Sequence, residues 1–345
     1  MTSPTIKDIA RIAGVSHSTV SRALHDHPAL APETIARIKR IALEQGYMPS
    51  AMARGLKTSR SRALGVILSF IDDPFFSQVL QGIEDVLQPA GYSLFVAASH
   101  RDAEREQLIV RAMAERRVEG VIVCSTPFQE EHARQLQEYN VPVAVVNNQA
   151  AEEYRYSIYH DDRDGIRQVT HYLLDLGHRQ IAYLGNILAG RTTQERLLGY
   201  QEEMRQAGLP TQDAQAPNGR PEGGFAGARV LIDQAKPPSA IVCFNDMIAL
   251  GVLRALDEAG RRVPQDCSVT GFDNISISAF TAPPLTTFNQ PKYELGFEAA
   301  QMMLRLLDCP PGDLSCSHPE KVLLSGNLLV RGSTAAPAGP LPAPR

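Results

Sequence analysis

The stretch of residues 5–24 constrains the fold more than any other part of this chain. Apolar residues recur at helical spacing on both sides of Gly14, which predicts two short helices that meet at that glycine. Glycine can end a helix in the left-handed conformation without steric cost. Ser16 is placed to cap the second helix, because its hydroxyl can accept from an unpaired backbone N–H. Val20 and Leu24 then face inward and leave a polar row outside.

The outward row of the second predicted helix consists of His17, Ser18, Ser21 and Arg22. Polar side chains that end in a guanidinium suit a helix lying in the major groove, where base edges present hydrogen-bonding groups. An ordinary helical hairpin with a solvated polar face has the same spacing, and two short helices bury little surface. Spacing by itself therefore favours the ordinary hairpin.

Charge is distributed unevenly along the chain. Residues 1–62 contain ten Lys and Arg and four Asp and Glu, a net charge of +6, whereas the whole chain carries −4. The remainder therefore carries −10, since −4 minus +6 is −10. A basic N-terminal module on an acidic body is typical of a unit that binds nucleic-acid phosphates.

The residues from Thr5 to Arg22 resemble the start of the lactose-repressor (LacI/GalR) family of bacterial transcription regulators. The family pattern T-I-x-D-I-A-x-x-A-G-V-S-x-x-T-V-S-R is present without a break, and the resemblance continues almost to the end, at residues 330–334. It implies a helix-turn-helix headpiece over 1–48, a hinge helix or linker over 49–61, and a ligand-binding and dimerisation domain over 62–334. The Pro/Ala-rich tail, 335–345, is expected to be disordered.

From residue 63 onward, strand-like apolar runs alternate with helical stretches. Strands are predicted at 64–69, 92–97, 120–124, 143–147, 181–184, 240–244, 268–271 and 285–288, with helices at 75–90, 103–117, 163–176, 192–207, 223–234, 246–259 and near 293–307. This alternation predicts parallel sheets with helices on both faces, in two Rossmann-like halves. The resemblance implies an α/β core of periplasmic-binding-protein type. Its N-subdomain would hold about 62–160 and 291–322, and its C-subdomain about 161–290 and 323–334.

Ligands of open parallel sheets bind beyond the carboxyl ends of the strands. The residues that follow these ends, or match the family's effector contacts, are Ser69, Phe75, Phe76, Asn147, Arg196, Asn245, Asp273 and Gln290. Converging amides, a carboxylate and a guanidinium suit a polyhydroxylated ligand, so the predicted effector is a sugar or sugar derivative. Arg196 alone would also tolerate a carboxylate or phosphate group. One of the two phenylalanines is expected to be a helix core residue, and Asp246 is an alternative cap for its helix.

The headpiece residues divide by the part of DNA that they contact. His17, Ser18 and Arg22 are predicted to read base edges, with Arg22 in a bidentate contact to guanine. The hydroxyl groups of Thr5, Ser16, Thr19 and Ser21 are predicted to hold phosphates and fix orientation. The resemblance implies that Leu56 enters the minor groove as a wedge and that Ala53 is its small neighbour there.

Several other classes of protein fit the sequence poorly. There is no Walker loop, no G-x-S-x-G motif, no metal-spaced His pair and no Rossmann glycine fingerprint, so we predict no enzyme, cofactor or metal. No apolar run approaches the ~18–20 residues that span a bilayer, and no signal peptide is present, which predicts a cytoplasmic protein. A cytosolic setting also argues against a stable disulfide between Cys309 and Cys316. A carbohydrate-binding transport receptor would need a signal peptide and no helix-turn-helix.

We therefore predict a sequence-specific transcription regulator, a repressor of carbohydrate-utilisation genes that binds a pseudo-palindromic operator as a homodimer. A sugar-like effector in the cleft between the subdomains would release it from DNA. The alternative is a regulator that depends on a co-repressor and responds to a nucleobase or another small metabolite.

Overall fold

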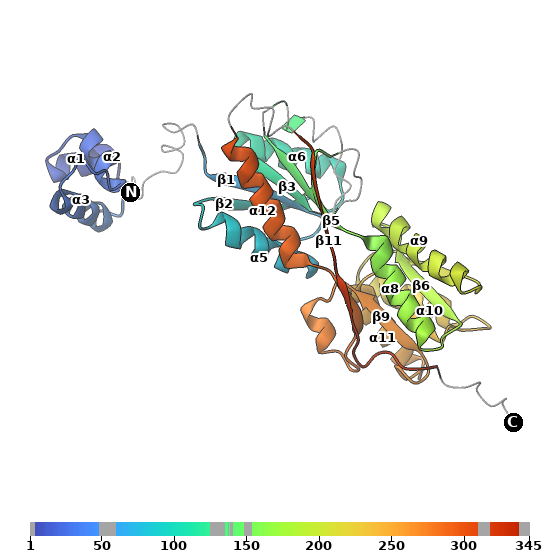
Figure 1. Ribbon diagram of the computed structural model, residues 1–345. Coiled ribbons are helices and arrows are strands. Elements are labelled where there is room, and N and C mark those ends of the chain that lie inside the picture. The colour runs from blue at the N-terminus through green and yellow to red at the C-terminus, as the bar shows by residue number, and fades with distance from the viewer. Residues whose placement is uncertain are drawn as a thin grey trace. The chain divides into compact units, whose positions relative to one another are not determined.

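The computed structural model describes residues 4–47, 60–124, 135–136, 138, 141–147, 154–309 and 318–337. The chain forms two compact units, Met1–Arg62 and Ala63–Arg345 (Figure 1). The predicted hinge residues Ala53 and Leu56, and the tail from residue 338 onward, lie outside the described residues.

The first unit consists of the helices α1 (Ile6–Ala13), α2 (His17–Leu24) and α3 (Pro32–Glu44). Gly14 ends α1 in the left-handed conformation at φ 66°, and the hydroxyl of Ser16 caps α2 by accepting from the backbone N–H of Thr19, as predicted. Pro32 opens α3, whose preceding residue Ala31 makes no side-chain cap. The three helices close a small core of Ile9, Ala10, Ala13, Val20, Ala23, Ile38 and Ala42, with Leu24 half-buried beside it.

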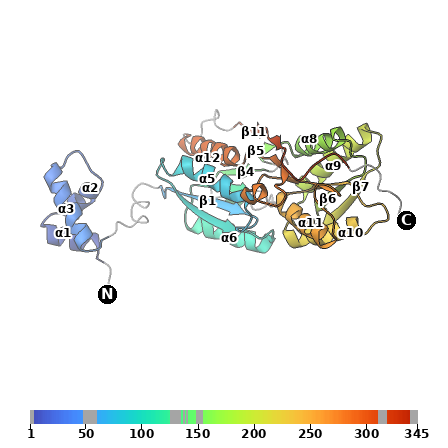
Figure 2. The ribbon, with the colours of Figure 1, turned by 90° about the horizontal axis from the view of Figure 1, so that it is seen from below.

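The second unit begins with a six-stranded parallel sheet in the order β11-β5-β4-β3-β1-β2. Its strands are β1 (Ala63–Leu68), β2 (Ser93–Ala98), β3 (Gly120–Cys124), β4 (Val143–Val146), β5 (Tyr156–His160) and β11 (Glu320–Leu324). The helices α5 (Phe75–Leu87) and α12 (Lys292–Asp308) pack on one face, and α6 (Ala103–Glu115) packs on the other (Figure 2). Central strands such as β1 are buried along their whole length, which explains their continuous apolar sequence.

The second sheet has the order β12-β10-β9-β8-β6-β7, with only β12 antiparallel to its neighbour. Its strands are β6 (Ile181–Asn186), β7 (Gln212–Ala216), β8 (Ala240–Cys243), β9 (Ser268–Phe272), β10 (Thr286–Asn289) and β12 (Asn327–Leu329). One face is covered by α8 (Asp162–Asp175) and α9 (Arg191–Gln206), the other by α10 (Pro221–Ile232) and α11 (Asp246–Glu258). A short 3-10 helix, η1 (Ser276–Ala279), follows β9.

The chain passes between the two sheets three times: after β5, between β10 and α12, and between β11 and β12. Consequently α12 and β11 return to the first sheet late in the sequence, and Figure 1 shows α12 beside α5. The mostly parallel α/β architecture with a helical N-terminal unit is the predicted fold class.

The eight predicted strands are all present, with ends within two residues of the predicted bounds. The strands β5, β7, β11 and β12 were not predicted. The glycine-rich run 223–227 lies in α10, where it allows close helix packing. A side chain at Gly224 would meet the backbone carbonyl of Ile248 in α11, and one at Gly251 would meet that of Pro221.

The cysteines differ in part from the prediction. Cys124, Cys243 and Cys267 are free and buried, whereas Cys309 is disulfide-bonded to a residue outside the described part of the chain. The expectation that Cys309 forms no stable disulfide is therefore wrong, because it rested on the cellular compartment alone. Among the described residues, no helix combines the length and apolar character that crossing a membrane requires.

Candidate functional sites

The outer face of α2 presents the predicted polar row to solvent. His17, Ser18 and Arg22 are exposed, while Val20 and Ala23 anchor the opposite face of the helix in the core. Arg22 makes no ion pair with any residue of the described range 4–47, so its guanidinium is available to an outside acceptor. A planar fork of donors on an exposed helix is the chemistry that a guanine edge requires.

The hydroxyl groups of the headpiece are less available than the sequence indicates. The Ser16 hydroxyl lies 2.7 Å from that of Ser18 and 2.8 Å from that of Thr19, so the three form one cluster at the start of α2. Thr5 belongs to a capping box: its hydroxyl donates to the Asp8 carboxylate at 2.7 Å and accepts from the Asp8 N–H. These Thr5 hydrogen bonds lower the pKa of Asp8. Ser21 is half-buried on the same helix.

In the second unit, all eight residues predicted to bind an effector line one pocket. Ser69, Phe75, Phe76 and Asn147 come from segments that follow strands of the first sheet. Arg196, Asn245, Asp273 and Gln290 come from segments that follow strands of the second sheet. We call this space, of about 500 Å³ and open to solvent, the inner pocket. Asp73, Arg101, Ala189, Thr192 and Phe244 also line it, and the sequence analysis did not select them.

Arg196 is held rigidly at the inner pocket. Its side chain is 3% exposed, and its Nε donates to the Asp162 carboxylate at 2.7 Å. Its guanidinium carbon lies 4.4 Å from the centre of the Phe244 ring and 3.9 Å from that of Phe272, and its Nη1 donates to the Phe244 carbonyl. Burial alone would raise the pKa of Asp162, but Arg196 and His160 beside it lower that pKa below its usual value. Much of the charge of Arg196 is therefore already balanced within the protein.

Asp273 is the most constrained acid of the inner pocket. Its backbone has φ 113°, a region that non-glycine residues rarely adopt, and its carboxyl group is buried. The Gln290 amide donates to that carboxylate, and the Lys292 ammonium donates to the Asp273 backbone carbonyl. Burial raises the pKa of Asp273 well above its usual value, although Arg196, with Nη1 3.9 Å from the carboxylate, opposes the shift.

Two observations concern the amides of the pocket. Among the described residues, the buried Gln290 Oε1 has no hydrogen-bond partner, and Gln290 lines the inner pocket. A buried acceptor without a donor costs free energy, so a ligand hydroxyl there would be stabilising. Asn245 is more occupied, because its Oδ1 accepts from the Ile248 N–H at 2.8 Å and its Nδ2 donates to the Gly219 carbonyl at 3.2 Å.

Asn245, rather than Asp246, is therefore the cap of α11, and the alternative that assigned the cap to Asp246 is wrong. The Asp246 carboxylate turns inward, where it accepts from the Thr287 hydroxyl at 2.6 Å and from the Ile275 N–H at 2.8 Å. Its burial raises its pKa to about 6. Phe75 and Phe76 are both buried in the core of the first sheet and both line the pocket, so neither role excludes the other.

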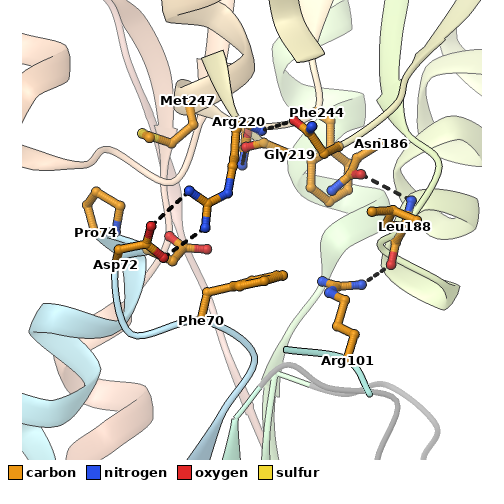
Figure 3. Close-up of a pocket in the computed structure, with 13 residues that line it drawn as sticks. Phe70, Asp72, Pro74, Arg101, Asn186, Leu188, Gly219, Arg220, Phe244 and Met247 are labelled. Carbon is orange, nitrogen blue, oxygen red and sulfur yellow. Dashed lines mark hydrogen bonds and ion pairs between the residues drawn. The ribbon is translucent and has the colours of Figure 1, made fainter. Parts of the chain in front are cut away.

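A second space adjoins the inner pocket, and most of its residues were not selected from the sequence (Figure 3). This outer pocket is lined by Phe70, Asp72, Asp73, Pro74, Arg101, Asn186, Leu188, Asn218, Gly219, Arg220, Phe244, Asn245 and Met247. Asp72 and Arg220 form a bidentate ion pair at 2.8 and 2.9 Å across it. Residues 70–74 follow the end of β1, so the expectation that ligands bind beyond the carboxyl ends of strands, which selected Ser69, could have selected them too.

A three-helix unit with an exposed polar helix, followed by two sheets with a polar pocket between them, defines a ligand-responsive DNA-binding regulator. The first unit matches the family model "Bacterial regulatory proteins, lacI family" over residues 5–50, and the second matches "Periplasmic binding protein-like domain" over residues 170–334. The chain belongs to the lacI family of bacterial regulatory proteins.

Individual proteins support the same assignment. The chain is 32% identical over 331 residues to the HTH-type transcriptional repressor PurR of Actinobacillus pleuropneumoniae serotype 3, covering 95% of this chain and 98% of the relative. The Lac repressor dimer bound to operator and the anti-inducer ONPF superposes with a TM-score of 0.84 at 27% identity, covering 97% of this chain and 100% of that one. The transcriptional regulator CelR in complex with cellobiose gives 0.71 at 27% identity, covering 96% and 99%. The prediction of a DNA-binding transcriptional regulator rather than an enzyme is confirmed by these relatives.

Proposed function

We propose that this regulator represses carbohydrate-utilisation genes from a pseudo-palindromic operator, as a cytoplasmic homodimer, and that a sugar-like effector in the inner pocket releases it. The observation that carries the proposal is the inner pocket itself. Eight polar and aromatic residues from both sheets converge there, and one of them, Gln290, has a buried acceptor without a donor among the described residues.

The chemistry of the inner pocket supports a hydroxylated ligand. The Asp273 carboxylate and the Gln290 carbonyl accept hydrogen bonds, while Arg196 and the hydroxyl groups of Ser69 and Thr192 donate them. Alternating donors and acceptors match the hydroxyl groups of a sugar, each of which can donate and accept. The solved complex of CelR with cellobiose, at 27% identity, supports the same class of effector for this chain.

A second candidate is a regulator that needs a co-repressor, such as a nucleobase or another small metabolite. One observation favours it: curated relatives at 31–35% identity are named PurR rather than after a sugar. The rings of Phe75, Phe76 and Phe244 in the inner pocket would also suit a flat heterocycle.

The DNA contacts follow from the exposed face of α2. We assign base contacts to His17, Ser18 and Arg22; the exposed Arg22 guanidinium makes no ion pair with any described residue of the headpiece. The hydroxyls of Thr5, Ser16 and Thr19 now bond within the headpiece, so the phosphate contacts proposed for them require either rotation of these hydroxyls or donation from backbone N–H groups. A phosphate contact is also proposed for the half-buried Ser21. The minor-groove roles of Ala53 and Leu56 remain proposals from the resemblance.

Dimerisation accounts for apolar side chains that the single chain leaves exposed. Phe95 and Val96 lie on the edge strand β2, at 43% and 41% exposure, and Phe280 lies just after η1 at 83%. An edge strand with exposed apolar residues is a pairing hazard unless a partner covers it. A second copy of the chain would cover these residues and bring two headpieces to the two halves of an operator.

Effector binding and DNA binding are linked through the position of the pocket. An effector can shift the protein away from the DNA-bound state only by binding another state more tightly. The inner pocket is built from both sheets, and Gln290 lies on the crossover between β10 and α12. A ligand that contacts both sides therefore has different contacts when the two subdomains move relative to one another.

The test separates the two sites. A DNA site is first selected from a random duplex library, and operator binding of the wild type, Arg22→Ala and Asp273→Asn is measured by fluorescence anisotropy. Arg22→Ala should weaken specific binding by about 1–3 kcal/mol, roughly 5- to 150-fold, while its effector response in a thermal-shift screen is kept. Asp273→Asn should keep DNA affinity and lose the effector response.

The outcomes against the proposal are equally specific. Loss of both activities in Arg22→Ala, with a changed circular dichroism spectrum, would mean that Arg22 is structural. A nucleobase that strengthens operator binding, with no response to any sugar, would establish the second candidate.

A further inference from the structure

The inner and outer pockets are two compartments of one space. They share Asp73, Arg101, Phe244 and Asn245, which form the common wall. The outer pocket has an empty volume of about 620 Å³ and the inner one about 500 Å³, so each compartment is comparable in size to the other. A ligand that fills only the inner compartment would make no contact with the residues that line the outer compartment alone.

The outer compartment has a different surface from the inner one. Phe70, Pro74, Leu188 and Met247 give it apolar walls of its own, in addition to the Phe244 ring that it shares with the inner compartment. Figure 3 shows the Phe70 ring projecting into the space between the Asp72–Arg220 pair and Arg101. The guanidinium carbon of Arg220 lies 5.2 Å from the centre of that ring. A ligand ring with an apolar face can pack here against the ring of Phe70.

Both sheets contribute to the enclosure of this compartment. Asp72 follows β1 of the first sheet, whereas Arg220 directly precedes α10 on the second, and their ion pair spans the opening. On another side, Arg101, which follows β2, donates to the Leu188 carbonyl, which follows β6. A ligand group held here is therefore contacted by both subdomains, as in the inner compartment.

The charges that line the two compartments are balanced. Arg220 is paired with Asp72, and Arg196 with Asp162. Asp73 also lines both compartments: burial raises its pKa above the usual value, although the hydrogen bond from the Phe75 N–H and the charge of Arg101 oppose the shift. A phosphate or carboxylate at Arg196 would have to displace Asp162, which is 1% exposed and would be left with a buried charge. At the more exposed Arg220 it would have to compete with the bidentate Asp72 carboxylate. The lining therefore favours an uncharged ligand.

We infer that the effector is a neutral glycoside of two rings, with a sugar ring in the inner compartment and a second ring against Phe70 in the outer one. The inference rests on the proposed function, since it takes the inner compartment as the sugar site. A second sugar, an aryl group and a nucleobase all present the required apolar ring face. The inference therefore predicts that free monosaccharides bind less tightly than two-ring glycosides, and that sugar phosphates bind less tightly than their neutral parents.

The test compares whole glycosides with their halves by isothermal titration calorimetry on the full-length protein. The panel holds disaccharides, aryl glycosides and nucleosides, together with the free sugars, bases and phosphorylated forms of each. At least one neutral two-ring compound should bind on the order of tenfold more tightly than either of its halves, and its phosphate should bind more weakly. The compound that binds most tightly then shows whether the ring in the outer compartment is a second sugar, an aryl group or a nucleobase.

Substitutions assign the gain to the outer compartment. Phe70→Ala should remove about tenfold of the affinity for the two-ring compound and leave the affinity for its sugar half unchanged. Phe70→Leu keeps apolar volume and should lose less, which guards against a folding defect. Leu108→Ala, at an exposed apolar residue of α6 that lines neither pocket, is the control and should change neither affinity.

Failure of this inference can be told apart from failure of the proposed function. If a free sugar binds as tightly as every two-ring compound and Phe70→Ala changes nothing, the outer compartment is not a subsite, although the sugar site stands. If a phosphorylated form binds more tightly than its neutral parent, the charge argument is wrong. If no sugar or glycoside binds the folded protein, both the inference and the sugar-effector proposal are wrong.

Discussion

Arg196→Met tests how far the inner pocket depends on one buried ion pair. The substitution removes the guanidinium from between two rings and leaves the Asp162 carboxylate, 1% exposed, without the cation 2.7 Å away. Breaking a buried pair by removing one partner costs about 3–5 kcal/mol. His160 Nε2 lies 3.2 Å from the same carboxylate and remains as a partner, so we expect a loss near the lower end, about 3 kcal/mol.

The pH dependence of this loss identifies its cause. In the wild type the folded pKa of Asp162 is lowered, so the group stabilises the fold above its unfolded pKa, about 3.9, and that contribution is lost as the pH falls through the folded value. In Arg196→Met, burial without the guanidinium should raise the folded pKa. The variant should then be least impaired near pH 4 and lose more stability as the pH rises through the raised folded pKa.

The assay is urea unfolding of the core followed by far-ultraviolet circular dichroism at pH 5 and pH 8, since the chain contains no tryptophan. The double variant Arg196→Met with Asp162→Asn removes both charges and should recover at least half of the lost stability. A loss that is equal at both pH values and unchanged in the double variant would refute the reasoning. Arg196 would then act through packing between Phe244 and Phe272 rather than through its charge.

Three further substitutions probe separate parts of the fold. The pKa of Asp246 is about 6 in the folded protein, above the value of about 3.9 in the unfolded chain, so its contribution to stability is lost as the pH rises through 6. Asp246→Asn should therefore reduce the fall in unfolding free energy between pH 4 and 8 by about 3 kcal/mol, measured by urea unfolding. Gly251→Ala should destabilise the core by about 1–3 kcal/mol, because the added methyl meets the Pro221 carbonyl; Arg254→Ala, exposed on the same helix, should change stability little. Ser16→Ala removes the cap of α2 and should cost the headpiece about 0.5–2 kcal/mol, measured by thermal unfolding, with Ser21→Ala as the comparison.

Most of the strands that sequence patterns predict are buried on both faces; the apolar edge strand β2 is the exception. Such strands are continuous apolar runs, as in β1 and β3, and their pattern does not depend on neighbours. The four strands that were missed have polar or mixed sequences. β7, β11 and β12 lie at sheet edges, and β5 has four aromatic or polar side chains among its five residues. Edge strands need only one covered face, so their sequences resemble loops.

The candidate site divides in the same way. Residues at strand ends, such as Ser69 and Asp273, could be placed because parallel strands bring their carboxyl ends to one edge of a sheet. The pairing of Arg220 with Asp72 could not be predicted, because the two residues are 148 positions apart in the sequence and come from segments that follow different sheets. The role of Asp162 was missed for a different reason: a helix-starting acid looks like an ordinary N-terminal charge until its buried arginine partner is known.

The late return of α12 and β11 to the first sheet has a consequence for synthesis of the chain. Residues 162–289 contain five of the six strands of the second sheet and all four of its covering helices, so most of that subdomain leaves the ribosome as one continuous segment. The first sheet lacks an edge strand and one covering helix until residue 324 has been made. The subdomain that begins first therefore receives its last covering helix only after most of the other has been made. The face that α12 will cover stays exposed while about 130 further residues are translated.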